Sequence, residues 1–189
     1  MLKELFLKNR SYRRFYEEVK ISSDKLREWI DLVRLSPSAA NLQPHRFIIS
    51  NSEDMNKKIF PNLNWAGYLK GWQGPKTGER PSAYIIMTTS KPVEKAFDPG
   101  IAALAILLGA VEAGFGGCAI ASFDKEKLKE ILDLDKEDAL VLVIALGKPK
   151  ENVLIENINA GEDIKYWRDE NNVHHVPKIK VKDLVIKEY

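Results

Sequence analysis

The chain has 189 residues, which is enough for one domain with a substantial hydrophobic core. Its composition is that of an ordinary globular protein, with 44% hydrophobic and 30% charged residues. A net charge of +2 gives no overall reason to expect a nucleic acid or an anionic membrane as a partner, so any basic site must be local. Cys118 is the only cysteine, which excludes an intrachain disulfide and fits a reducing compartment. Because the charged N-terminus is also unlike a signal peptide, we expect a cytoplasmic protein.

Two helices are predicted in the N-terminal part of the chain. Residues 2–8 show a short amphipathic pattern. Ser23 is placed to cap a second helix that runs to about Leu35, and Pro37 ends it. The inward face of this second helix is expected to carry Leu26, Trp29, Ile30 and Val33.

Two polar segments flank the second helix, and each has a plain and a functional interpretation. Residues 9–15 hold three arginines within five positions. They form either a solvated turn or an anion site, because guanidinium groups bind phosphate in bidentate fashion. Residues 36–45 are small, polar and interrupted by two prolines, so they are either a simple connection or a place where a ligand approaches the backbone. Residues 46–49 follow as a strand.

A long irregular segment follows a short predicted helix at residues 52–59. It covers residues 60–82 and contains Trp65, Tyr68 and Trp72. A structureless loop of this length is usually a lid, a binding loop or disordered, and the tryptophans argue against disorder. An aromatic lid over a flat ligand and simple packing against the body of the protein both remain open.

The most hydrophobic strands lie in the middle and later parts of the chain. Residues 83–89 are apolar on both faces, which predicts a central strand. Residues 115–121 read as an extended segment, and Asp124 is expected to cap the helix that follows. Residues 139–146 form the clearest buried strand in the sequence.

We expect the chain to be organised around one helix, from Asp98 to Ala113. Asp98 is placed to cap its first turn, Pro99 suits its first position, and Gly114 can supply the left-handed residue that stops it. Glu112 is its only charged residue after the first turn, so the helix must be covered on all sides. It is too short to span a membrane, which takes roughly 20 apolar residues.

Little periodicity is visible after Lys148 until residues 183–186, which we expect to form an edge strand. The polar tail, about 150–189, therefore reads as an arm that lies on another surface, such as a second subunit. Strands separated by helices without a regular βαβ rhythm favour an α+β fold. We expect one domain over residues 1–189, with a central mixed or antiparallel sheet flanked by helices.

Several catalytic motifs are absent from the sequence. The glycines at 114–117 follow a helix and so do not match a dinucleotide fingerprint. There is no Walker A sequence, HExxH, paired CxxC or recognisable Ser-His-Asp signature, and a metal site is not expected. We identify no catalytic side chain. The sequence offers groups that can bind an anion, a loop of small residues and several aromatic residues, but no evident nucleophile. This combination suits a cofactor that carries the chemistry itself.

Five segments, in order along the chain, resemble the FMN-dependent nitroreductase family. The two most specific are Arg10-Ser11-x-Arg13-Arg14-Phe15 and Ser36-Pro37-Ser38-Ala39-Ala40-Asn41-x-Gln43-Pro44. The others are Phe97-Asp98-x-Gly100, Gly114-x-Gly116 and Gly147-Lys148-Pro149. The sequence departs from the family pattern at Asn9, where many members have another arginine, and at His45, where an aromatic residue is common.

The resemblance implies an α+β homodimer with two FMN molecules at the interface. It assigns cofactor-binding roles to groups of residues from different parts of the chain. Arg10, Ser11 and Arg13 would hold the phosphate and the pyrimidine side of the flavin. Pro37, Ser38, Ala39 and Asn41 would come from the other subunit, with Gln43 near the ring. The segment Ile120, Ala121 and Ser122 would place backbone groups near the reactive edge, and Lys178 and Lys180 would complete the phosphate site.

By the same resemblance, the flavin would take a hydride from NADH or NADPH and pass it to a small oxidised acceptor such as a nitroaromatic or a quinone. One pocket would serve both partners in turn, which gives a ping-pong scheme. Arg13 or a C-terminal lysine would stabilise the negative charge of the reduced flavin. The alternatives are a flavin store or sensor without turnover, and a flavin-destroying or dehalogenating enzyme on the same fold. A nucleic-acid patch at the arginines is disfavoured by the charge balance.

Overall fold

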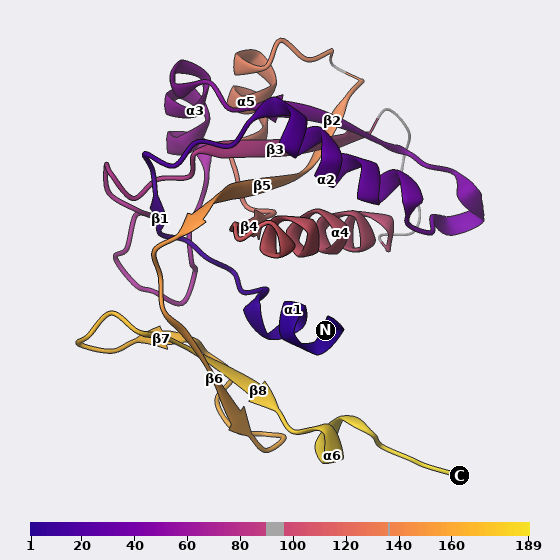
Figure 1. Ribbon diagram of the computed structural model, residues 1–189, viewed down its shortest axis with the longest axis vertical. Coiled ribbons are helices and arrows are strands. Elements are labelled where there is room, and N and C mark those ends of the chain that lie inside the picture. Colours follow the sequence, from indigo (N-terminus) through magenta and orange to yellow (C-terminus); the bar gives the residue numbers. More distant parts are fainter. Residues whose placement is uncertain (90–96, 136) are drawn as a thin grey trace. The chain divides into compact units, whose positions relative to one another are not determined.

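The computed structural model describes residues 1–89, 97–135 and 137–189 (Figure 1). These residues form two compact units. The first unit comprises residues 1–65 and 74–150, and the second comprises residues 66–73 and 151–189.

A five-stranded antiparallel sheet lies at the centre of the first unit (Figure 1). The long strand β5 (Ala139–Pro149) pairs along one edge with β3 (Ala83–Thr89), and β3 pairs in turn with β2 (His45–Ser50). Strand β5 also pairs with β4 (Gly116–Ile120) and with the short β1 (Phe15–Tyr16). All seven residues of β3 are buried, which confirms the prediction of a central strand.

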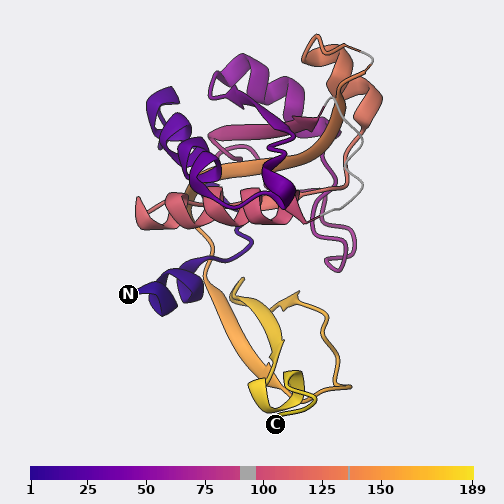
Figure 2. The same cartoon turned by 90° about the vertical axis from the view of Figure 1, so that its right-hand side faces the viewer.

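Helices cover both faces of this sheet (Figure 2). On one face α2 (Ser23–Leu35) packs against α4 (Asp98–Glu112). On the other face α3 (Glu53–Ile59) packs against α5 (Lys125–Ile131). The remaining helical elements of the unit are α1 (Leu2–Lys8), η1 (Ala39–Asn41) and η2 (Phe60–Asn62). The predicted α+β fold with a sheet flanked by helices is confirmed.

The main hydrophobic core lies between the sheet and the α2–α4 layer. Ile85 of β3 stands opposite Ile144 of β5, and both are fully buried. Trp29 of α2 and Ile106 of α4 belong to the same buried cluster. At Gly109 the two helices approach so closely that an added Cβ would lie 2.6 Å from Leu32 Cδ1. The inward residues predicted for α2 therefore do pack on the core.

The start of α4 differs from the sequence prediction. Phe97 occupies the N-cap position without a side-chain cap, and Asp98 is the first residue of the helix. The Asp98 carboxylate instead accepts hydrogen bonds from the segment around Ser38, described below. The prediction that Asp98 caps its own helix is therefore wrong, because the Ser38 hydroxyl and the Ala39 N–H take up the carboxylate instead.

The end of α4 agrees with the prediction. Gly114 has a φ of 76°, in the left-handed region where a Cβ is disfavoured. The Gly114 N–H donates to Val111 O, and the Phe115 N–H donates to Ala110 O. These two bonds form the Schellman pattern that satisfies the last helical carbonyls.

One side of α4 is left partly exposed by the residues that the structure describes. Leu104 is 40% exposed, although the helix carries almost only apolar residues. The expectation of complete burial is therefore not met by a single copy of this chain.

Three other helices have side-chain N-caps at or next to residues that the sequence favours for capping. Asp124 accepts from the Lys127 N–H and caps α5 as predicted. Ser52 caps α3 in the same way. The cap of α2 is Ser22, which accepts from Lys25 N–H, and Ser23 is the first helical residue. The prediction of a Ser23 cap was wrong by one position, because two adjacent serines offer the same side chain.

The second unit contains a sheet that the sequence did not predict. Strand β6 (Val153–Ile158) pairs in parallel with β8 (His174–Ile179), and β7 (Trp167–Arg168) pairs antiparallel with β8. The expected edge strand at residues 183–186 is wrong, because the short helix α6 (Val181–Leu184) occupies this place. The Asp183 carboxylate accepts from the Ala160 N–H, which ties the helical turn to its own unit.

The irregular segment 60–82 packs its aromatic residues against the protein. Trp65 is buried, and its ring centroid lies 5.8 Å from that of Phe60. In the second unit, the guanidinium of Arg168 lies 4.4 Å from the ring centroid of Trp72. These contacts support the packing interpretation for both tryptophans over that of an open lid.

Candidate functional site

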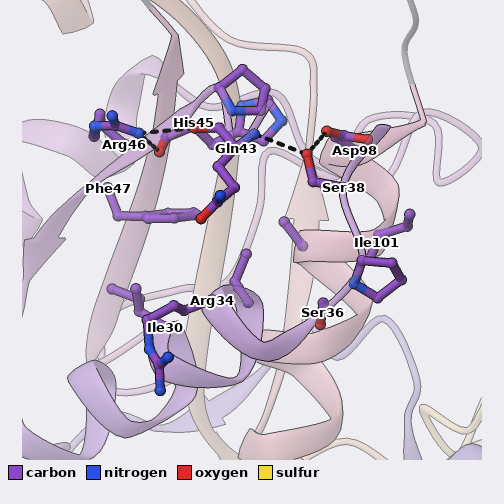
Figure 3. Close-up of a pocket in the computed structure, with 14 residues that line it drawn as sticks. Ile30, Arg34, Ser36, Ser38, Gln43, His45, Arg46, Phe47, Asp98 and Ile101 are labelled. Atoms are coloured by element: carbon purple, nitrogen blue, oxygen red, sulfur yellow. Dashed lines mark hydrogen bonds between the residues drawn. The ribbon is translucent and has the colours of Figure 1, made fainter. Parts of the chain in front are cut away.

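The small polar loop between α2 and β2 is fastened to the first residue of α4 (Figure 3). The Ser38 hydroxyl donates to Asp98 Oδ2 over 2.6 Å, and the Ala39 N–H donates to Asp98 Oδ1 over 3.1 Å. The Gln43 N–H in turn donates to Ser38 Oγ over 3.0 Å. These bonds hold the pKa of Asp98 below its usual range, chiefly through the Ser38 hydroxyl.

The loop adopts a backbone that ordinary residues avoid. Ala40, Asn41 and Gln43 all have φ between 45° and 54°. Such left-handed residues are uncommon outside glycine and persist where the surroundings determine them, often at functional sites. The Gln43 side-chain amide donates to both the carbonyl and the side-chain oxygen of Asn41, which closes the loop on itself.

A cavity of about 200 Å³ lies beside this loop. Its walls combine apolar residues of α2 and α4 with polar residues of the loop and β2, as Figure 3 shows. His45 contributes to the wall and is 9% exposed. Burial lowers the pKa of His45, against smaller opposing effects of the Thr88 backbone and the Asp98 carboxylate. The imidazole is therefore neutral at pH 7.

The arginine segment lies at the start of β4. The Tyr12 N–H donates to Gly117 O over 3.0 Å, and Ser11 forms a parallel bridge with the same residue. Arg10 donates through one terminal nitrogen to Phe6 O, but its buried Nε has no hydrogen-bond partner among the described residues. Arg13 is only 9% exposed. Burial lowers the pKa of Arg10, so an anion placed beside it would be stabilised.

The third arginine of the segment has a different role. Arg14 binds Glu79 through two hydrogen bonds of 2.8 Å, and Lys150 Nζ lies 3.2 Å from the same carboxylate. Glu79 is 5% exposed, and the Arg14 guanidinium lowers its pKa to about 2. The three arginines therefore differ in role. Arg14 forms a buried ion pair with Glu79, whereas Arg10 and Arg13 lie beside β4.

The segment that follows β4 is also positioned by hydrogen bonds. The Asn64 backbone N–H donates to Ser122 O, and its side chain donates to Ser122 Oγ, both over 3.0 Å. Ile120 is buried at the end of the strand, and Ala121 is exposed between these two residues. The predicted residues Arg10, Ser11 and Arg13 thus lie beside the start of β4, and the predicted residues 120–122 lie at its end.

The predicted lysines belong to the second unit. Lys178 is exposed on β8, and Lys180 Nζ donates to Asn159 Oδ1 over 3.1 Å.

The structure places the two main groups of predicted site residues at opposite ends of α4 (Figure 1). Pro37, Ser38 and Ala39 lie at the first residue of the helix, whereas Arg10 to Arg13 lie beside Gly117, just beyond its end. The helix has 15 residues, which at 1.5 Å per residue makes it about 22 Å long. The two groups therefore do not meet within one chain.

Sequence reasoning missed two buried carboxylates that shape these regions. The sequence predicts a helix cap at Asp98, and it predicts no role for Glu79. A carboxylate that opens an almost wholly apolar helix was the available signal for Asp98. Glu79 gave no local signal, since its partners Arg14 and Lys150 are far away in the sequence.

No helix in residues 1–89, 97–135 or 137–189 combines the length and hydrophobicity needed to cross a membrane. The same part of the chain holds no cluster of three or more His, Cys, Asp or Glu side chains able to bind a metal ion.

Comparisons with known proteins agree with one another. A solved nitroreductase family protein from Clostridium novyi superimposes with a TM-score of 0.65 and 27% identity over 79% of this chain and 87% of that one. A provisionally assigned nitroreductase from Exiguobacterium sibiricum, solved in complex with FMN, gives 0.64 and 19% over 80% and 89%. YdgI of Bacillus subtilis, provisionally named an NAD(P)H nitroreductase, is 24% identical over 181 residues, covering 77% of this chain and 87% of that protein.

The sequence model described as the nitroreductase family matches residues 7–148, which is most of the chain. This range contains the arginine segment, the Ser36–Pro44 loop and the five strands of the central sheet except Pro149, the last residue of β5. The chain belongs to the nitroreductase family of oxidoreductases.

Proposed function

We propose that this protein is an FMN-dependent oxidoreductase that passes a hydride from NAD(P)H to a small oxidised acceptor, such as a nitroaromatic or a quinone. Membership of the nitroreductase family supports the reaction class. The Exiguobacterium sibiricum structure with FMN supports the choice of flavin. The proposal rests above all on the arginine segment, where the Arg10 Nε is a buried donor without a partner among the described residues.

The residues beside β4 fit the anionic end of such a cofactor. The Arg10 Nε is buried without a partner among the described residues, and Arg13 is mostly buried close by. A phosphate is the anion that guanidinium groups bind best in bidentate geometry. From this end, β4 leads the chain to residues 120–122, where exposed Ala121 offers backbone groups to a flat ring.

The same chemistry calls for a fixed cation near the pyrimidine side of the ring. FMN, when bound, supplies the hydride chemistry, and the chain supplies binding, orientation and charge. Arg13 or one of the C-terminal lysines is our candidate for this cation, because a preorganised positive charge favours the reduced, negatively charged ring. No side-chain acid or base is required for the hydride transfer.

We further propose that the protein acts as a homodimer with the site shared between two copies. The loop that carries Ser38 and Asn41 lies at the first residue of α4, whereas the arginine segment lies beyond the end of this helix, which is about 22 Å long, so we expect that one chain does not close both groups around one ligand. A second copy related by a two-fold axis can bring its own loop to the arginines. Leu104 is half-exposed, and apolar residues are exposed at 181–186. Both support an interface with a second copy, in which the C-terminal arm lies on the partner.

The proposal is tested by purifying the protein and recording its visible absorption spectrum. We expect a yellow protein that releases FMN on denaturation and is bleached rapidly by NADH or NADPH under anaerobic conditions. Subsequent addition of a nitroaromatic or a quinone should restore the oxidised spectrum. Bound flavin that is not bleached would favour a store or sensor, and loss of the flavin itself during turnover would favour a flavin-destroying enzyme.

The arginine assignment has its own test. Replacing Arg10 and Arg13 together by alanine should weaken FMN binding at least tenfold, since each charge-assisted hydrogen bond contributes roughly 1.5–3 kcal/mol. Fluorescence titration of the apoprotein with FMN measures this. Arg27→Ala is a matched control, because Arg27 is exposed on α2 and pairs only with Asp24 in the contacts observed. Equal FMN affinity in the double variant and the control would refute the assignment.

A further inference from the structure

A buried carboxylate lies beneath the loop that carries Asn41 and Gln43. Asp98 is 6% exposed, and both of its oxygens accept hydrogen bonds from the start of the loop. The bond from Ser38 is short, at 2.6 Å, as expected for a hydroxyl that donates to an ionised carboxylate. Asp98 therefore fixes Ser38 and Ala39 to the first turn of α4.

The Ser38 hydroxyl uses its only proton within this arrangement. Its proton is donated to Asp98, and its oxygen accepts the Gln43 N–H over 3.0 Å. A hydroxyl has only one proton, so Ser38 has none left to donate to a ligand. The chain of bonds from Asp98 through Ser38 to Gln43 spans the whole loop.

Other bonds turn two side chains outward. The Asn41 N–H donates to Ser38 O, which completes the turn. The Gln43 amide nitrogen donates to Asn41 Oδ1 over 3.1 Å. This pairing leaves Asn41 Nδ2 and Gln43 Oε1 as a donor and an acceptor on exposed side chains. The left-handed backbone at Asn41 and Gln43 is unfavourable alone and needs such outside support.

We propose that Asp98 is a positioning residue that acts through Ser38 to hold the loop 38–43 in the conformation that presents Asn41 and Gln43 to the cofactor. In this arrangement the Ser38 hydroxyl donates to Asp98 and not to the cofactor. The identity of the cofactor rests on the function proposed above, whereas the support of the loop by Asp98 does not depend on it.

The test compares Asp98→Ala, Ser38→Ala and the double variant in two measurements on the full chain. The first is amide hydrogen exchange of residues 38–43 without added ligand. The second is the affinity of the apoprotein for FMN. Because both residues belong to one chain of bonds, each single variant should speed exchange at Gln43 and weaken FMN binding by about tenfold or more, and the double variant should be no worse than the poorer single variant.

Two further variants separate positioning from general damage. Asp98→Asn keeps an oxygen that can accept the Ser38 proton, so it should recover part of the lost protection and affinity. Glu112→Gln, at the exposed far end of the same helix, should change neither measurement. Should Asp98→Ala fail to fold, Asp98→Asn and Ser38→Ala provide the same comparison.

The outcomes distinguish this proposal from the proposed function. Additive losses of FMN affinity in the double variant would show that Ser38 contacts the cofactor independently of Asp98. Unchanged hydrogen exchange in Asp98→Ala would show that the loop does not need Asp98. Either result would overturn the positioning role. If the wild-type chain binds no FMN, the proposed function fails and the presentation of Asn41 and Gln43 to FMN fails with it. Faster amide exchange of residues 38–43 in Asp98→Ala than in the wild type would still support the role of Asp98 in holding the loop.

Discussion

Glu79 shows how a single buried charge can organise segments far apart in the sequence. Its carboxylate receives two bonds from Arg14 and lies near Lys150, and it is 5% exposed. An uncompensated buried charge is costly, whereas this one has two cationic partners. The cluster joins the N-terminal segment, the irregular segment and the end of β5.

Replacing Glu79 by glutamine should therefore lower the free energy of unfolding by about 3 kcal/mol, because the buried Arg14 guanidinium loses its anionic partner. Urea denaturation at pH 7 measures this. Glu4→Gln is the matched control, since Glu4 forms an exposed ion pair with the N-terminus, and such pairs contribute less than about 1 kcal/mol. A Glu79 variant as stable as that control would contradict the structural role of the cluster.

Acidification should reproduce the effect of that substitution. The folded state lowers the pKa of Glu79 from 4.5 to about 2, so its contribution is fully present above pH 4.5 and is lost as the pH falls towards 2. A shift of this size corresponds to roughly 3 kcal/mol. The difference in unfolding free energy between wild type and Glu79→Gln should shrink steadily between pH 4.5 and pH 2. If the difference in unfolding free energy did not depend on pH, the cationic partners would not lower the pKa of the Glu79 carboxyl.

At the scale of elements, local patterns predicted the first unit well and the second poorly. Strand β3 and helix α4 are long and strongly apolar, and Gly114 ends α4 as expected because a left-handed residue favours glycine. The sheet of β6 and β8 was missed because it is parallel and non-local, and because Pro177 interrupts the usual strand signal.

The candidate site was predictable only in part. The motifs identified its two polar segments, but local sequence could not show that Arg14 is taken by Glu79 or that Asp98 serves the loop of Ser38. Both contacts join residues about sixty positions apart, and only the tertiary fold decides them.

The sheet of the second unit should respond to pH through His175. Its Nδ1 lies 2.6 Å from Glu156 and its Nε2 3.4 Å from Asp169, and the Trp167 ring stacks on it with a centroid distance of 4.7 Å. The carboxylates, Glu156 first, raise the pKa of His175 above 6.5. The stabilisation is therefore complete below pH 6.5 and is lost as the pH rises through the raised value.

We accordingly expect amide protection of residues 153–179 to be higher at pH 6 than at pH 8.5. Hydrogen exchange corrected for its intrinsic pH dependence measures this. Glu156→Gln should lower the pKa of His175, seen by NMR, and move the loss of protection to lower pH. A His175 that titrates at its ordinary value in the wild type would refute the interaction.

Helix α4 provides a test of the proposed dimer surface. Leu104 is 40% exposed in the single chain, so Leu104→Glu should affect the folding of one subunit little but should disfavour a dimer that buries this position. Light scattering measures the mass, and Leu104→Ala is the matched apolar control. We expect a dimer for the wild type and the control and a monomer with weakened FMN binding for Leu104→Glu. A yellow dimer from Leu104→Glu would exclude this face from the interface.

At the scale of the whole molecule, the separation of the two halves of the site by α4 can be tested by mixing subunits. One variant carries Arg10→Ala and Arg13→Ala, and the other carries Asn41→Ala and Gln43→Ala. Each homodimer then has two damaged sites. If each site joins the arginines of one subunit to the loop of the other, a heterodimer contains one site damaged in both halves and one fully intact site.

A doubly tagged heterodimer purified from coexpressed subunits should therefore bind one FMN with wild-type affinity, although both parent homodimers bind FMN weakly. A tagged wild-type pair, treated in the same way, should bind two and serves as the control for the tags. Sites formed within single subunits would leave the heterodimer with one damaged half in each site, and its affinity would match those of the parents. Because the two groups lie at opposite ends of α4, a helix about 22 Å long, recovery of one intact site is the outcome that we expect from the proposed dimer.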